Sequence, residues 1–185
     1  MLTRNFDNYI AGIMTIQPDI SSPTEDHWRG GVPGAVKNTN GAIRIMNNYG
    51  FSTYSLFGNS NTHDNYATYP TPGTVTHSAL LVGSGTDDET YHDYKFEVIS
   101  NLNVVGNRSV SIAYTADACK YTTVKTFINN TDADVTVNEL GLFWHYSSGL
   151  DYLLYRKKLG QPVTLKANGG TATFKLEVDI PYNKP

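Results

Sequence analysis

The segment from Thr171 to Ile180 alternates apolar and polar residues without exception. Successive side chains of a β-strand point to opposite faces of a sheet, so this segment predicts a strand with one buried face and one solvated face. The side chains expected on the buried face are Ala172, Phe174, Leu176, Val178 and Ile180. The side chains expected on the solvated face are Thr171, Thr173, Lys175, Glu177 and Asp179.

A short strand and a turn are predicted just before this segment. Pro162–Leu165 has the composition of a strand, and the five residues after it read Lys-Ala-Asn-Gly-Gly. Asn and Gly tolerate the positive φ that tight turns require. We therefore expect a β-hairpin that ends in the half-buried strand.

The composition of the whole chain favours an all-β fold with many turns. Thirteen Tyr, seven Phe and 16 Gly occur among 185 residues, and only 17% of residues are charged. Short apolar segments follow one another between turn signals, with no alternation of strands and helices. We predict an antiparallel β-sandwich, jelly-roll-like, over residues 41–185. The expected strands are 42–47, 49–57, 78–83, 93–100, 109–114, 121–129, 135–144, 152–159, 162–165 and 171–180, with a hairpin loop at 129–134.

Residues 1–40 are predicted to form an N-terminal arm and an assembly loop. Met1–Gln17 has apolar residues at roughly helical spacing and stops at Pro18, so it is either a short amphipathic helix or an extended arm. It packs either on its own domain or on a neighbouring subunit. Asp19–Asn40 is expected to be a long ordered loop, because Trp28 and Val32 are costly to leave in water. The predicted assembly residues are Phe6, Tyr9, Ile10, Ile13 and Trp28.

Charge and cysteine content exclude several classes of protein. A net charge of −3 argues against nucleic acid as the main partner, because phosphate binding needs a concentrated excess of Lys and Arg. Cys119 is the single cysteine, so an intrachain disulfide framework is excluded. The first residues lack the pattern of a signal peptide, and no apolar run approaches the length of a membrane span. We expect synthesis and folding in the cytosol and no membrane partner.

No catalytic, metal or cofactor motif is found in the sequence. The five histidines lack metal-binding spacing, and no nucleophile elbow, phosphate-binding loop or dinucleotide fingerprint occurs. Asp87-Asp88-Glu89 lacks the alternating ligands of a calcium loop and is expected to be a solvated acidic turn. Cys119 is expected to be a buried or half-buried thiol. We therefore expect no enzyme activity and no cofactor.

Aromatic residues offer an alternative function. Tyr54, Tyr66 and Tyr69 could form a platform on which a sugar stacks, together with Tyr91 and Trp144. Aromatic residues in β proteins more often belong to the core or to cross-strand pairs.

Three stretches carry a resemblance to a known class of proteins. They are VGSGTDDETYHDYKFEV (82–98), TVKTFINNTDADVTVNELGLFW (123–144) and LLYRKKLGQPVTLKANGGTATFKLEVDIP (153–181). In order and spacing they are similar to segments of the small β-rich virion proteins of tailed bacteriophages. The resemblance covers roughly residues 80–181.

This resemblance implies a non-enzymatic structural component of a virion, made in the host cytoplasm. Its partners would be further copies of itself and neighbouring capsid, neck or tail proteins. The shared residues have architectural roles: Gly141 suits close strand packing, Arg156 could pair with Glu139 across strands, and Pro162 starts an edge strand. The alternative is a carbohydrate- or receptor-binding module of a phage fibre that binds a host-surface glycan.

Overall fold

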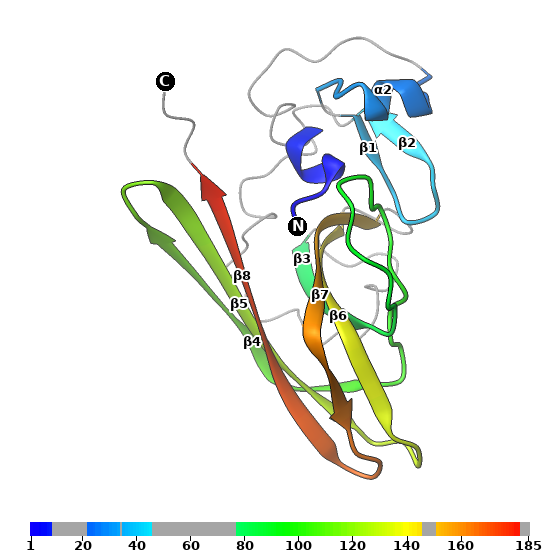
Figure 1. Cartoon of the computed structure of the whole chain (residues 1–185), viewed down its shortest axis with the longest axis vertical. Helices are drawn as coiled ribbons and strands as arrows, with labels where there is room; N and C mark the ends of the chain where they lie inside the picture. Colours follow the sequence, from blue (N-terminus) through cyan, green and yellow to red (C-terminus); the bar gives the residue numbers. More distant parts are fainter. Residues whose placement is uncertain (9–21, 34, 46–76, 146–150, 182–185) are drawn as a thin grey trace.

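The structure is a computed structural model that describes residues 1–8, 22–33, 35–45, 77–145 and 151–181. It contains two antiparallel three-stranded sheets and a small two-stranded sheet (Figure 1). The all-β prediction is therefore confirmed. The first large sheet has the order β3-β6-β7, with β3 His77–Gly83, β6 Val135–His145 and β7 Asp151–Leu165. The second has the order β4-β5-β8, with β4 Asn103–Tyr114, β5 Ala118–Asn129 and β8 Gly170–Pro181. The small elements are α2 Glu25–Arg29, β1 Ala35–Lys37 and β2 Ile43–Ile45.

The two large sheets approach each other at one end and diverge at the other (Figure 1). A cluster of buried side chains from both sheets fills the space where they approach. Burial of this apolar surface is the main force that holds the two sheets together. Its members include Leu80, Val82, Val137, Leu140 and Leu142 from the first sheet, and Tyr121, Phe127, Phe174, Leu176 and Val178 from the second.

The alternation that predicted the last strand is confirmed. In β8, Phe174, Leu176 and Val178 are buried, and Ala172 and Ile180 are partly buried. All five polar side chains between them are exposed. The predicted turn before this strand is also confirmed, because Asn168 and Gly169 both have positive φ, at 57° and 114°.

The predicted terminal hairpin is wrong, and so is the hairpin at 129–134. The turn after β7 leads into β8, which pairs with β5 in the other sheet from Ala118↔Pro181 to Asn129↔Gly170. The loop after β5 likewise leads into β6, which pairs with β3 and β7. Turn residues determine only a local reversal of the chain. Which strand becomes the hydrogen-bonded neighbour is decided by burial in the shared core.

Two predicted strands are parts of one observed strand. Residues 152–159 and 162–165 belong to one strand, β7. A register shift separates them, because Val137 opposes Val163 while Glu139 opposes Lys158. The predicted strand 93–100 is not a strand. It pairs with β3 through a single bridge, Gly83↔Val98, although partly buried and exposed side chains alternate from Tyr94 to Val98.

The described part of the N-terminal segment packs on its own chain. Leu2 forms a bridge with Tyr155, and the Thr3 backbone N–H donates to the Leu154 carbonyl at 3.0 Å. Residues 4–8 are helical. Residues 1–8 thus contact their own domain, and a contact with a neighbouring subunit stays a prediction.

Residues 22–40 contain regular structure, so the prediction of a long loop is wrong there. They include α2 and β1, and β1 pairs with β2 across the predicted domain boundary at residue 40. Trp28 is fully buried, as expected of an ordered segment. Its indole N–H donates to Asn5 Oδ1 at 3.0 Å, and the same oxygen accepts from the Lys37 backbone N–H at 2.7 Å. The predicted strand 49–57 lies outside the described residues.

Candidate functional site

A buried ion pair joins β6, the central strand of the first sheet, to its neighbour β7. Arg156 on β7 donates from Nε to Glu139 Oε2 on β6 at 2.7 Å. Glu139 is fully buried and Arg156 is 7% exposed. The pairing of Arg156 with Glu139, expected from the resemblance, is present.

The remaining donors of Arg156 hold the segment that follows β3. Nη1 donates to Asp93 Oδ2 at 2.8 Å, and Nη2 donates to the Asp87 carbonyl at 3.2 Å. The other oxygen of Glu139 accepts from the Gly85 backbone N–H at 3.1 Å. Burial alone would lower the pKa of the Arg156 guanidinium, but its hydrogen bonds to Asp93 and Glu139 raise that pKa above the usual value. The guanidinium is therefore charged at neutral pH.

Two glycines allow this close packing. A Cβ atom at Gly85 would lie 2.4 Å from Glu139 Oε1, so any larger residue would push the loop off the carboxylate. A Cβ atom at Gly141 would lie 2.4 Å from the ring of Phe96 and 2.8 Å from that of Phe143. The two rings stack with their centroids 5.1 Å apart. Close packing at Gly141, expected from the resemblance, is present.

Exposed pairs tie the acidic turn to β7. Lys158 Nζ donates to Asp88 Oδ1 at 2.8 Å, and the Lys158 backbone N–H donates to Glu89 Oε2 at 2.9 Å. The hydrogen bond from Lys158 lowers the pKa of Asp88. The carboxylates of Asp88 and Glu89 are thus used in docking the turn on the sheet.

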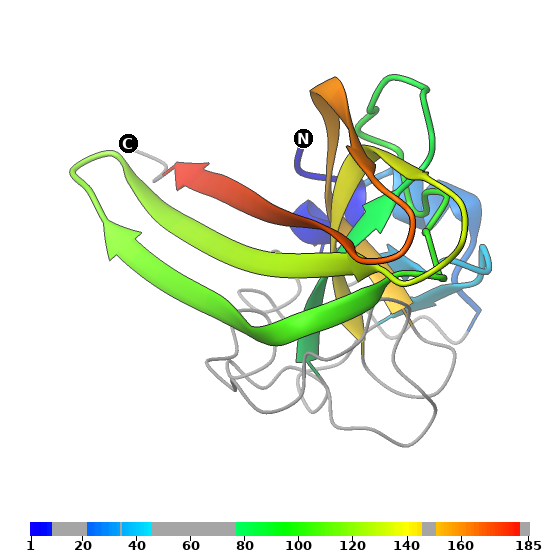
Figure 2. The ribbon, with the colours of Figure 1, turned by 90° about the horizontal axis from the view of Figure 1, so that it is seen from below.

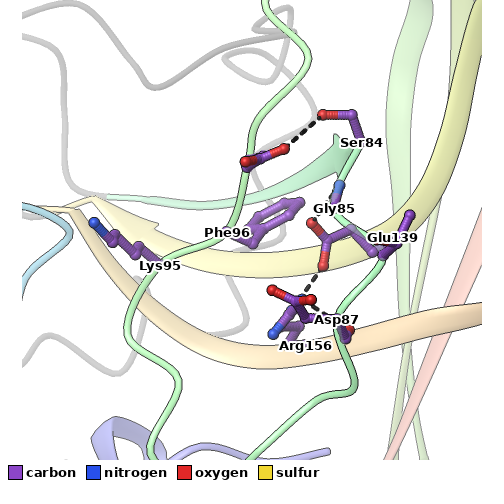
Figure 3. Close-up of a pocket in the computed structure, with 9 residues that line it drawn as sticks. Ser84, Gly85, Asp87, Lys95, Phe96, Glu139 and Arg156 are labelled. Carbon is purple, nitrogen blue, oxygen red and sulfur yellow. Dashed lines mark hydrogen bonds and ion pairs between the residues drawn. The ribbon is translucent and has the colours of Figure 1, made fainter.

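A cavity of about 440 Å³ lies between the first sheet and the chain segment that follows β3 (Figure 3). Its lining residues are Ser84, Gly85, Thr86, Asp87, Lys95, Phe96, Glu97, Glu139 and Arg156. The two buried charged groups, Glu139 and Arg156, are directed to each other and to the loop. Three N–H groups of Arg156 and both carboxylate oxygens of Glu139 are used in these contacts.

One hydroxyl–carboxylate contact borders the cavity. Ser84 Oγ donates to Glu97 Oε2 at 3.2 Å, and both residues are exposed. An activated nucleophile needs a base that a third group orients. Among the described lining residues no histidine lies beside this pair, and the contact links two neighbouring chain segments.

The predicted assembly residues fall into two sets. Phe6 is 5% exposed and Trp28 is fully buried, so both belong to the core of this chain. An assembly role for them stays a prediction, and it would act through the surface that they support. Tyr9, Ile10 and Ile13 lie outside the described residues, as do the predicted ligand-stacking residues Tyr54, Tyr66 and Tyr69.

Other candidate residues have structural contacts. His92 packs edge-on against Trp28, with ring centroids 5.7 Å apart, and its neighbour Asp93 binds Arg156. Cys119 on β5 is partly exposed. Pro162 lies on β7, an edge strand of its sheet, but within the strand and not at its start. No cluster of three potential metal ligands occurs among the described residues.

Sequence reasoning missed the loop partners of the ion pair. Gly85 and Asp87 lie in a segment without periodicity, and Asp93 lies at the start of the predicted strand 93–100. Their contacts with β6 and β7 span 54 to 69 residues of sequence. The one available signal was the resemblance, which includes all three residues.

Comparisons of this chain with protein-family models, with curated proteins and with solved structures find no match. Within the described residues, no helix is both long enough and apolar enough to cross a membrane.

Proposed function

We propose that this chain is a non-enzymatic structural component of a bacteriophage virion. Its two large sheets form an antiparallel, jelly-roll-like β-sandwich. The sandwich contacts further copies of the chain and neighbouring capsid, neck or tail proteins through its N-terminal arm and its sheet edges.

The observation that carries the proposal is where the three resembling stretches meet. Gly85, Asp87, Asp93 and Phe96 come from the first stretch, Glu139 and Gly141 from the second, and Arg156 from the third. These stretches are far apart in the sequence, yet their polar and close-packed residues form one cluster. A resemblance confined to common strand-forming residues would have no reason to converge on a single buried site.

The chemistry of this cluster supports an architectural role. A buried ion pair is costly to form and is satisfied only when further hydrogen bonds complete it. Here the extra bonds come from the loop after β3, so the pair fixes that loop in one position on the sheet. A rigid loop of this kind suits a protein that must present the same surface in every copy of an assembly.

Mass spectrometry of purified particles tests the proposal. Particles would be purified on a density gradient from lysates of the phage that encodes the chain. We expect the chain in a constant ratio to the main capsid protein across gradient fractions and preparations. If the chain stays in the soluble fraction and is absent from intact particles, the proposal is wrong.

A further inference from the structure

The outer edge of β4 is the least protected sheet edge in the described structure. The sheet order β4-β5-β8 leaves β4 with one hydrogen-bonded neighbour. Its distal half, Ser109–Tyr114, reads Ser-Val-Ser-Ile-Ala-Tyr and contains no charged residue and no proline. Such an edge exposes unpaired backbone donors and acceptors, and natural proteins protect most edges against pairing with other chains.

Both edges of the other large sheet have protection. Residues 1–3 cover part of the β7 edge through the Leu2↔Tyr155 bridge, and β7 itself contains Lys157, Lys158 and Pro162. The end of β3 is covered by residues 97–99, since the Ile99 backbone N–H donates to the Val82 carbonyl at 3.0 Å. Covering segments, lysines and proline are the usual means by which an edge is blocked.

The opposite edge of the β4–β5–β8 sheet is also protected. On β8 the exposed face holds Lys175, Glu177 and Asp179, and the strand ends at Pro181. The first half of β4 is also protected against pairing, because a register shift between Val105 and Ser109 forms a β-bulge there. The unprotected part therefore begins after the bulge and runs to the tip of the hairpin.

This distal part is exposed on both faces. Ile112 is 41% exposed and Tyr114 is 77% exposed, while Ser111 and Ala113 on the opposite face are exposed too. Figure 2 shows the β4–β5 hairpin projecting away from the first sheet, with β4 as its outermost strand. Among the described residues no segment pairs with this edge.

We propose that the distal half of β4 pairs antiparallel with the same strand of a second copy of this chain, around a two-fold axis at Ile112. In this register Ile112 faces Ile112 of the second copy, and Val110 faces Tyr114 of the second copy. On the other face Ser111 faces Ala113 of the second copy. The two three-stranded sheets then form one continuous sheet of six strands.

The sequence of the edge favours a second copy as its partner. A strand pairs with itself only if no like charges meet across the axis, because like charges directly opposite are destabilising. Ser109–Tyr114 is neutral, and reversing it places its apolar residues against each other and its small residues against each other. A two-fold contact of this type also closes on itself, so it yields a dimer and not a fibre. The inference deepens the assembly role proposed above by naming the surface and the partner.

Sedimentation velocity of the full-length chain over a range of concentrations tests the pairing. We expect a monomer–dimer equilibrium in the unmodified chain. Ile112→Lys should weaken dimerisation by at least about tenfold, because two lysines would face each other at the axis and an apolar contact would be lost. Val163→Lys is the matched control, since Val163 is 36% exposed on the other sheet and should leave the equilibrium unchanged. A chain that stays monomeric, or an Ile112→Lys variant that dimerises as before, would overturn the proposal.

Engineered cysteines test the register without depending on the lysine variant. In a Cys119→Ser background, Ile112→Cys should crosslink rapidly under mild oxidation, because residues opposite each other across antiparallel strands lie within disulfide range. Ser109→Cys should not, since the two copies of that position would be roughly 20 Å apart along the strands. Dimers that crosslink equally at 109 and 112, or only at 109, would contradict pairing at Ile112. Absence from virions would leave both solution results unchanged, so the two proposals fail separately.

Discussion

At residue 156 one guanidinium group, itself 7% exposed, binds three different acceptors. Removing one partner of such a buried pair leaves the other charge without compensation, which typically costs about 3–5 kcal/mol. Arg156→Met should therefore lower the free energy of unfolding by an amount of this order in urea titrations. Glu139→Gln should have a similar effect.

The control for this prediction is the exposed ion pair between Lys158 and Asp88. Lys158→Met removes the contact with Asp88, whose side chain is 92% exposed. Exposed ion pairs contribute little to stability because solvent screens them. A loss of stability in Lys158→Met as large as that in Arg156→Met would contradict the special role of the buried cluster.

Gly141 tests the packing of the loop on the sheet. Gly141→Ala places a methyl group against Phe96 and Phe143, and overpacking of this kind costs about 1–3 kcal/mol. Gly160→Ala is a matched control, because no atom lies within 4 Å of a Cβ atom built at that position. Thermal unfolding should show a lower midpoint for Gly141→Ala alone. The double variant Gly141→Ala, Phe96→Leu should recover part of the loss, and a failure to recover would mean that Phe96 is not the obstacle.

Tyr91 links stability to alkaline pH. Burial, a hydrogen bond to Asp7 and the charge of Asp7 raise the pKa of Tyr91 to about 12, above its ordinary value of 10.0. The Tyr91 hydroxyl therefore holds its proton more tightly in the folded state than in the unfolded state. The resulting stabilisation is complete below pH 10 and is lost as pH rises from 10 towards 12.

We expect the free energy of unfolding to fall over that pH range, and to fall less steeply in Tyr91→Phe. Urea titrations at pH 9 and at pH 11 measure the two slopes. Some slope should remain in the variant, because burial also raises the pKa of Tyr155. Equal slopes in the variant and the unmodified chain would show that folding does not raise the pKa of Tyr91.

At the scale of elements, the N-terminal segment, α2 and β1 depend on one side chain. A helix of five residues such as α2 is not stable alone, so its order comes from tertiary contacts. Trp28 supplies them, since its ring packs against His92 and Tyr94 and its indole N–H binds Asn5. Removing a buried tryptophan costs about 3–5 kcal/mol.

Trp28→Ala should therefore loosen this region more than the rest of the chain. Hydrogen exchange followed by mass spectrometry should show faster exchange in residues 1–8, 25–37 and 91–94. Peptides from β5 and β8 should keep their protection, because their ladder has no contact with Trp28 among the described residues. Uniform loss of protection would mean that Trp28 stabilises the whole fold and not one region.

Elements near the end of the chain show what sequence patterns can and cannot predict. The burial of Phe174, Leu176 and Val178 follows from period-two alternation, which is a local property. Strand pairing is not a local property. The predicted backbone conformation of the turn after β7 is therefore confirmed, whereas the predicted pairing of the two strands that it connects is wrong. β5 is a second case in which the pattern is insufficient. Its buried face includes Thr123 and Lys125, and Lys125 Nζ donates to the Leu80 carbonyl at 3.3 Å. Alternation of apolar residues cannot predict a buried face that includes a lysine.

The candidate site was partly predictable from the resemblance. The resemblance implied close packing at Gly141 and the pairing of Arg156 with Glu139, and all three residues lie on strands. Asp87 and Asp93 lie in an irregular segment whose path depends on the sheet beneath it. Their contacts with Arg156 could be found only from the folded chain.

For the whole molecule, the described chain combines a compact region with a projecting one. The loop after β3, the N-terminal segment and the first sheet pack around the Glu139–Arg156 cluster. The distal β4–β5 hairpin extends beyond that region (Figure 2). Its side chains Ile112 and Tyr114 are exposed to solvent. Exposed apolar surface next to an unprotected edge is typical of a protein that functions in an assembly.

Electron cryomicroscopy of purified particles tests the virion proposal most directly. We expect density at regularly repeated positions into which the two three-stranded sheets fit, with the distal β4 strands of neighbouring copies side by side. A map that is complete at side-chain resolution, with every repeated density assigned to other proteins, would contradict a structural role in the virion.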